Sequence, residues 1–185
     1  MSKYLVYLLV SFLSLKAISL EVTLTQGTVK PTPIAVTDLF SENTNFEKIG
    51  KNISNVISDN LERSGLFIPL DDKAFIQSNK SLSQQPRFED WKVIKAQHLV
   101  AGKITGSNGK ISVEFRLYDV FQQKQLVGKK YETSEKNWRR VAHIISDSVF
   151  KNITGEGGYF DTRIVYVAET GPKENKQKRL AIMDQ

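Results

Sequence analysis

Two residues in the chain have the spacing of an acid/base pair. His143 and Asp147 stand four positions apart, so a helix would place both side chains on the same face. A histidine beside a carboxylate can move protons during a reaction. No recognisable motif places a nucleophile beside these two residues, and a histidine in an amphipathic helix is usually structural or surface-exposed. We therefore predict that His143 is structural or surface-exposed and not catalytic.

The remaining acidic pairs and the glycine-rich segment have simpler interpretations. Asp71-Asp72 and Glu89-Asp90 match the acids that the positive end of a helix dipole favours. Gly155 to Gly158 lack the strand-glycine-helix order and the Lys-Ser/Thr of a phosphate-binding loop, so we predict an interdomain hinge there. The chain has no cysteine, two histidines and no metal-ligand spacing. We predict no enzyme, no cofactor and no metal.

The first nineteen residues have the pattern of a secretory signal peptide. Lys3 precedes the apolar run Tyr4 to Leu15, and small side chains follow at Ala17 and Ser19. A buried helix or a membrane anchor is the alternative, but a membrane span needs about 20 apolar residues. We predict cleavage after Ser19, export to the periplasm and a mature protein that is peripheral to membranes. Without Lys3 and Lys16 the formal charge falls from +6 to +4.

The hydrophobic periodicities predict an α/β (α+β) fold. Helices are expected at 45–64, at 88–94 and from Trp138 to just before Gly155, and buried or alternating strands at 66–70, 99–105, 111–118 and 124–133. The dipeptide Asn108-Gly109 predicts a tight hairpin whose second strand has one solvent-exposed face, and Gly128 predicts a weak point or a bulge in the following strand. We expect an open mixed sheet with two main helices on one face.

Two further segments flank this fold. Residues 21–26 alternate between apolar and polar side chains, and the prolines of residues 30–33 predict a hinge after this short strand. At the other end, residues 162–185 read as two strands joined by a charged turn, Lys173 to Arg179, which we interpret as solvated. Two strands bury little surface alone. We therefore predict a domain at 20–155, a hinge at 156–161 and the start of a second domain at 162–185.

Three stretches, taken in order, make the chain similar to the TolB family of the Tol-Pal envelope system. They are Val113 to Val120, Arg140 to Asp147, and Thr154 to Val167. The resemblance implies an amino-terminal domain like the anticodon-binding domain of class II tRNA synthetases, followed by a six-bladed β-propeller. Residues 162–183 would supply only the first strands of an incomplete propeller blade. The lipoprotein Pal, which docks on the family's propeller, is then expected to be lost as a partner.

The same resemblance implies a partner for the beginning of the mature chain. In the family this stretch contacts the carboxy-terminal domain of TolA, and the matching residues here are Leu20, Glu21, Val22, Thr23, Leu24, Thr25 and Gln26. A short alternating strand can add to the open sheet edge of a partner. The alternative is that these residues form an edge strand of their own sheet. Both interpretations remain open from the sequence.

Two other functions compete with this interpretation. A nucleic-acid-binding module is the runner-up, because the expected fold resembles an anticodon-binding domain and the sequence pI is about 9.4. The secretory segment argues against nucleic acid as a partner. An enzyme is the third candidate, but no Gly-x-Ser-x-Gly motif is present. The leading prediction is a periplasmic binding protein that supports outer-membrane constriction during cell division and envelope integrity.

Overall fold

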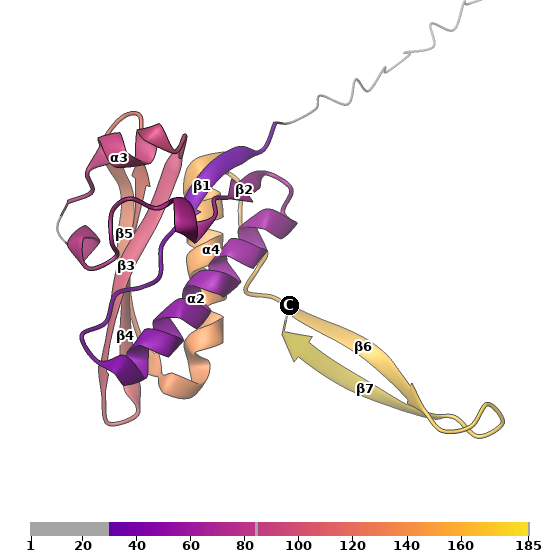
Figure 1. The fold of residues 1–185 in the computed structure, drawn as a ribbon. Coiled ribbons are helices and arrows are strands. Elements are labelled where there is room, and N and C mark those ends of the chain that lie inside the picture. Colours follow the sequence, from indigo (N-terminus) through magenta and orange to yellow (C-terminus); the bar gives the residue numbers. More distant parts are fainter. Residues whose placement is uncertain (1–29, 84, 185) are drawn as a thin grey trace, which may run out of the picture.

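The computed structural model describes residues 30–83 and 85–184, and a five-stranded sheet lies at its centre. The strand order is β2-β1-β3-β4-β5 (Figure 1). β1 (Thr32–Val36) pairs in parallel with β2 (Phe67–Pro69) and with β3 (His98–Ser107). β4 (Lys110–Asp119) and β5 (Lys124–Ser134) continue the sheet in antiparallel order. The predicted mixed α/β fold is confirmed, whereas the likeness to an anticodon-binding domain stays a prediction.

Two long helices, α2 (Thr44–Arg63) and α4 (Trp138–Thr154), cover one face of the sheet, as predicted (Figure 1). Their apolar residues recur every three or four positions, which forms one stripe per helix. These stripes and the facing strand residues form the main core, which includes Ile34, Ile53, Ile57, Leu61, Val100, Phe115, Ile145 and Val149. The helices therefore owe their stability mainly to burial against the sheet.

Helix α2 begins one residue earlier than the expected capping box at Thr44. Its cap is Asn43, whose Oδ1 accepts a hydrogen bond from the backbone N–H of Asn45 at 2.9 Å. Asparagine is among the strongest N-cap residues, because its short side chain reaches the free N–H groups of the first turn. Gly65, with a φ of 73°, follows the other end of the helix.

The opposite face of the sheet is covered at one end, which the sequence did not suggest. Helix α3 (Phe88–Val93) and the 3₁₀ turns η1 (Asp72–Ala74) and η2 (Ser81–Ser83) lie there. A second core joins this layer to the sheet and comprises Ala35, Leu82, Phe88, Trp91, Ala96, Leu99, Ala101, Tyr118 and Val120. The wet face predicted for β4 is correct for Ser112, Glu114 and Arg116, but Tyr118 is buried under α3.

Two local predictions in the sheet need correction. The hinge expected at 30–33 is shorter, because Thr32 and Pro33 already lie in β1. The Thr32 N–H donates to the Leu66 carbonyl at 2.8 Å, and the Pro33 carbonyl accepts from Gln97 at 2.9 Å. The bulge lies at Leu126 instead of Gly128, since Leu117 pairs with Val127 and Tyr118 with Gln125. The Asn108-Gly109 turn is confirmed, with positive φ at both residues.

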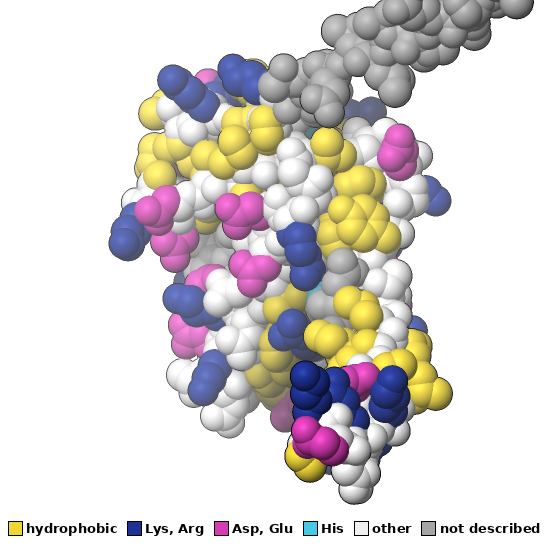
Figure 2. Space-filling model, turned by 90° about the vertical axis from the view of Figure 1, so that its right-hand side faces the viewer, with side chains coloured by type: hydrophobic (Ala, Val, Ile, Leu, Met, Phe, Trp, Pro, Cys, Tyr) yellow, Lys and Arg dark blue, Asp and Glu magenta, His cyan; other side chains and the backbone are white. Residues whose placement is uncertain are grey.

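The last two strands, β6 (Arg163–Thr170) and β7 (Gln177–Asp184), form a separate two-stranded sheet. This hairpin extends away from the helices (Figure 1). It carries apolar side chains that are about half exposed or more: Ile164, Val165, Tyr166, Val167, Leu180, Ile182 and Met183. Figure 2, which faces the side where the hairpin projects, shows apolar surface interspersed with Lys and Arg side chains. Of the predicted charged turn, Lys178 and Arg179 instead belong to β7.

Candidate functional site

The site residues predicted from the sequence, Leu20 to Gln26, lie outside the described residues, as does the predicted signal peptide 1–19. The described chain begins at Lys30, which is exposed, and enters the sheet at Thr32. β1 has a hydrogen-bonded neighbour on each side, β2 and β3. The described chain after the predicted arm therefore enters an interior strand of the sheet.

His143 and Asp147 do not form an acid/base pair. His143 is 3% exposed, and its Nδ1 lies 2.9 Å from Asn60 Nδ2 of helix α2. The same amide nitrogen donates to Ser146 Oγ at 2.9 Å, and Arg63 donates to Asn60 Oδ1 at 2.5 Å. Because the amide nitrogen is a donor, the network assigns His143 Nδ1 as its acceptor. Of the two alternatives left by the sequence, structural or surface-exposed, the structure places His143 in a buried contact between α4 and α2.

Asn60 is the central residue of this network, and sequence reasoning missed it. It follows Ile53, Val56 and Ile57 at helical spacing, and Leu61 comes directly after it. A polar residue within an apolar stripe usually has a buried hydrogen-bond partner. That position in the pattern could have identified Asn60 as a buried polar contact between α2 and α4.

Asp147 uses its carboxylate for a different purpose. Its Oδ1 accepts the backbone N–H of Phe160 at 2.7 Å, and its Oδ2 accepts that of Asp161 at 3.1 Å. Both donors belong to the segment that the sequence predicted as a hinge. Whether residues 156–161 separate two domains stays a prediction, but the structure shows that the end of this segment is attached to α4.

The other acidic pairs begin helical turns, as predicted. Asp71 precedes η1, where its Oδ1 accepts the N–H of Lys73 at 3.0 Å. Glu89 and Asp90 occupy the first turn of α3. Within residues 30–83 and 85–184, no three His, Cys, Asp or Glu side chains are grouped to hold a metal ion. No helix in the same part of the chain is long and apolar enough to cross a bilayer.

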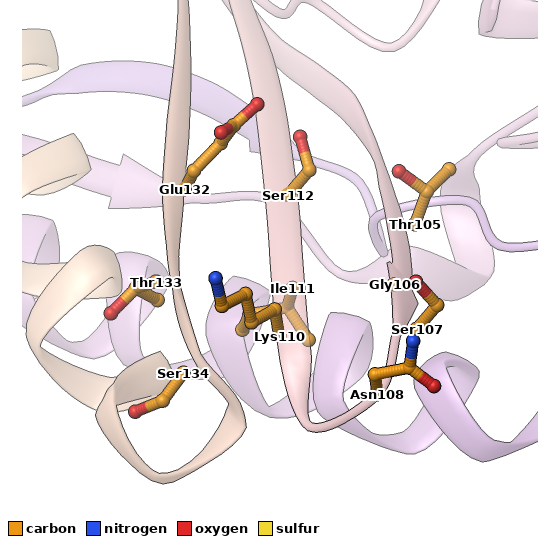
Figure 3. Close-up of a pocket in the computed structure, with 10 residues that line it drawn as sticks. All are labelled: Thr105, Gly106, Ser107, Asn108, Lys110, Ile111, Ser112, Glu132, Thr133 and Ser134. Atoms are coloured by element: carbon orange, nitrogen blue, oxygen red, sulfur yellow. The ribbon is translucent and has the colours of Figure 1, made fainter.

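A shallow pocket of about 730 Å³ lies across the ends of β3, β4 and β5 (Figure 3). Its lining is mostly hydroxyl, amide and backbone groups, contributed by Thr105, Gly106, Ser107, Asn108, Lys110, Ile111, Ser112, Glu132, Thr133 and Ser134. A hydrogen bond from Lys130 lowers the pKa of Glu132 and so favours its ionised form. The lining contains no histidine and can offer hydrogen bonds to a polar group. The alternation of the strands did not reveal this pocket, because it forms only where three strand ends meet.

Two partly buried groups that lie outside this pocket have shifted pKa values. Burial lowers the pKa of His98, and Asp119, its neighbour across the β3–β4 pair, opposes that shift. Burial also raises the pKa of Asp38, while Lys51 acts in the opposite direction. Shifts of this kind occur both at functional sites and in structural contacts. Here each has a packing explanation.

Comparison with known proteins decides the family. The model of the TolB amino-terminal domain matches residues 20–126, which is more than half of the chain. This chain belongs to the TolB family. The TolB resemblance drawn from the motifs is thereby confirmed.

Individual TolB proteins agree with this assignment. The Tol-Pal system protein TolB of Paramagnetospirillum magneticum (strain ATCC 700264 / AMB-1) is 49% identical over 166 residues, which cover 89% of this chain and 37% of that relative. The crystal structure of TolB from Acinetobacter baumannii has the same fold, with a TM-score of 0.68 and 24% identity. That match covers 84% of this chain and 37% of the other. The chain thus spans little more than a third of the length of these TolB proteins.

Proposed function

We propose that this chain is a periplasmic protein-protein interaction component of the Tol-Pal system that binds the carboxy-terminal domain of TolA through Leu20 to Gln26. In this role it supports outer-membrane constriction during division and envelope integrity. Membership of the TolB family is the observation that carries the proposal. Residues 1–19 act as the export signal and are removed after Ser19. The function is binding, without catalysis, a cofactor or nucleic acid.

The arrangement of the sheet favours an arm that is free to bind a partner over an arm that pairs with its own sheet. An incoming strand can pair only at a sheet edge, and the near edge of the five-stranded sheet is β2. β2 has three residues, and one of them, Pro69, has no backbone N–H to donate. A strand of six residues finds little to pair with there.

The far edge lies at the limit of what the chain can reach. A strand added beyond β5 would lie about 19 Å from β1, since neighbouring strands are about 4.8 Å apart. The link from Gln26 to Thr32 spans at most about 20 Å when completely straight. The link would also have to cross β3, β4 and β5 to reach that edge. The backbone groups of the arm are therefore best satisfied by the sheet edge of another protein.

Pal is expected to behave differently from TolA. In the family Pal docks on the propeller, and this chain spans 37% of the TolB proteins that it matches. We propose that β6 and β7 are the opening strands of the first blade. A polypeptide prepared as residues 20–185 should therefore capture TolA and fail to capture Pal.

The experiment is a titration of residues 20–185 against the TolA carboxy-terminal domain by calorimetry. A variant that starts at Gly27 should lose binding while its thermal midpoint stays nearly unchanged, because the deleted residues precede the sheet. Thr23→Pro should also abolish binding by removing a backbone donor from the added strand. Thr28→Pro, just beyond the arm, is the matched control. Full affinity of the chain starting at Gly27 would refute the proposal.

A further inference from the structure

The segment between α4 and β6 is attached to α4 at several points, although its composition predicts a flexible hinge. Asp147 places one carboxylate oxygen on each of two successive backbone N–H groups, those of Phe160 and Asp161. Hydrogen bonds to a charged acceptor are roughly twice as strong as neutral ones. A single side chain thus holds two consecutive residues of the linker in one conformation.

Gly158 allows this close approach. A Cβ atom at residue 158 would lie 2.5 Å from the Asp147 Cα and 2.7 Å from its Cβ, so any other residue would push the linker away from the helix. By contrast, a Cβ at Gly157 would meet nothing within 4 Å. After the capping hydrogen bonds of Gly155 and Glu156 at the end of α4, the close packing of the linker against the side of the helix therefore begins at residue 158.

Phe160 attaches the linker to the core. Its side chain is fully buried, and its ring lies 5.8 Å from that of Phe150 in α4, edge to face. Phe150 in turn contacts Phe67 of β2, with ring centroids 6.2 Å apart. Withdrawing Phe160 would expose a large apolar ring and leave a cavity. Outside the core, Arg140 adds a more exposed contact to Asp161 at 3.3 Å.

We propose that Asp147 together with Gly158 to Asp161 forms a latch that fixes the direction in which the β6–β7 hairpin leaves α4. The hairpin begins two residues after Asp161, at Arg163, so the direction of its first strand follows from where the latch holds the chain. A change in the orientation of the hairpin requires the Asp147 hydrogen bonds to break and Phe160 to leave the core. This inference is independent of TolA binding.

Amide hydrogen exchange tests the latch directly. In the unaltered chain the amides of Phe160 and Asp161 should be protected. Asp147→Asn keeps the side-chain shape but turns one acceptor into a donor that faces a backbone N–H. This variant should speed exchange at these two amides roughly ten- to a hundredfold, because the loss of a hydrogen bond to a charged group raises the population of the open state by about that factor. Arg140→Gln, which removes only the exposed contact, is the control and should leave both rates nearly unchanged. Unprotected amides in the unaltered chain, or no effect of Asp147→Asn, would overturn the proposal.

The orientation of the hairpin can be measured separately. The chain has no cysteine, so Lys51→Cys in α2 and Lys173→Cys in the hairpin turn give a unique pair of spin-label sites. We expect one narrow distance distribution in the unaltered background and in Arg140→Gln. Asp147→Asn and Gly158→Ala should lose that single narrow peak while keeping their circular dichroism spectra. A broad distribution in the unaltered chain, or a narrow one in both variants, would show that the latch does not set the orientation. If a variant fails to fold, the width of the distance distribution in the unaltered chain still tests the proposal.

Discussion

Replacing Asn60 by alanine should destabilise the domain far more than its polar character suggests. Asn60 is 1% exposed and donates to His143 Nδ1 and to Ser146 Oγ, each at 2.9 Å. Alanine would leave both acceptors buried without this donor. An abandoned buried polar group costs about 1–3 kcal/mol, so we expect a loss of about 3 kcal/mol. For a protein of this size that lowers the thermal midpoint by about 6–12 °C.

The control for this prediction lies on the same helix. Asn55 is exposed, so Asn55→Ala makes the same chemical change without breaking a buried contact. It should be neutral or slightly stabilising, because alanine is the better helix former. Urea unfolding followed by circular dichroism gives both free energies. A cycle with Ser146→Ala should show strong non-additivity, since the two residues share a hydrogen bond. If Asn60→Ala costs no more than Asn55→Ala, the buried network does not contribute as we argue.

Two further predictions concern the sheet. Gly102→Ala should cost about 1–3 kcal/mol or more, because the new Cβ would collide with the Glu114 carbonyl oxygen and lie 2.9 Å from Leu39 Cδ2. The urea midpoint of Gly102→Ala should lie well below that of Gly157→Ala, whose Cβ meets nothing within 4 Å. Equal midpoints would contradict the packing argument. The lowered pKa of His98 means that the unfolded chain takes up a proton near pH 6.5, whereas the folded chain does so only at lower pH. Stability should therefore fall as the pH drops through 6.5 towards the folded pKa, and then level off. His98→Gln should lack that step in urea unfolding between pH 7.5 and 5, and parallel profiles for both proteins would exclude His98 as its source.

The polar residues show most clearly where sequence reasoning stopped. The spacing of His143 and Asp147 correctly placed both on one helix, but this placement does not reveal which residues each side chain contacts. His143 contacts Asn60, which is 83 positions away, and Asp147 contacts a segment that comes after its own helix. Neither contact follows from a local pattern. The glycine-rich composition after α4 similarly indicated freedom, whereas Gly158 permits a close approach to α4.

The sequence by itself determined the type of most elements, the mixed sheet with two helices on one face, and the TolB family. These conclusions were possible because helical and strand periodicities, turn dipeptides and family motifs are properties of nearby residues. Only the tertiary structure decided that a second core covers the end of the opposite face, that Asn60 joins α2 to α4, and that Asp147 holds the linker. Each of these depends on side chains distant in the chain that meet only after the layers have packed.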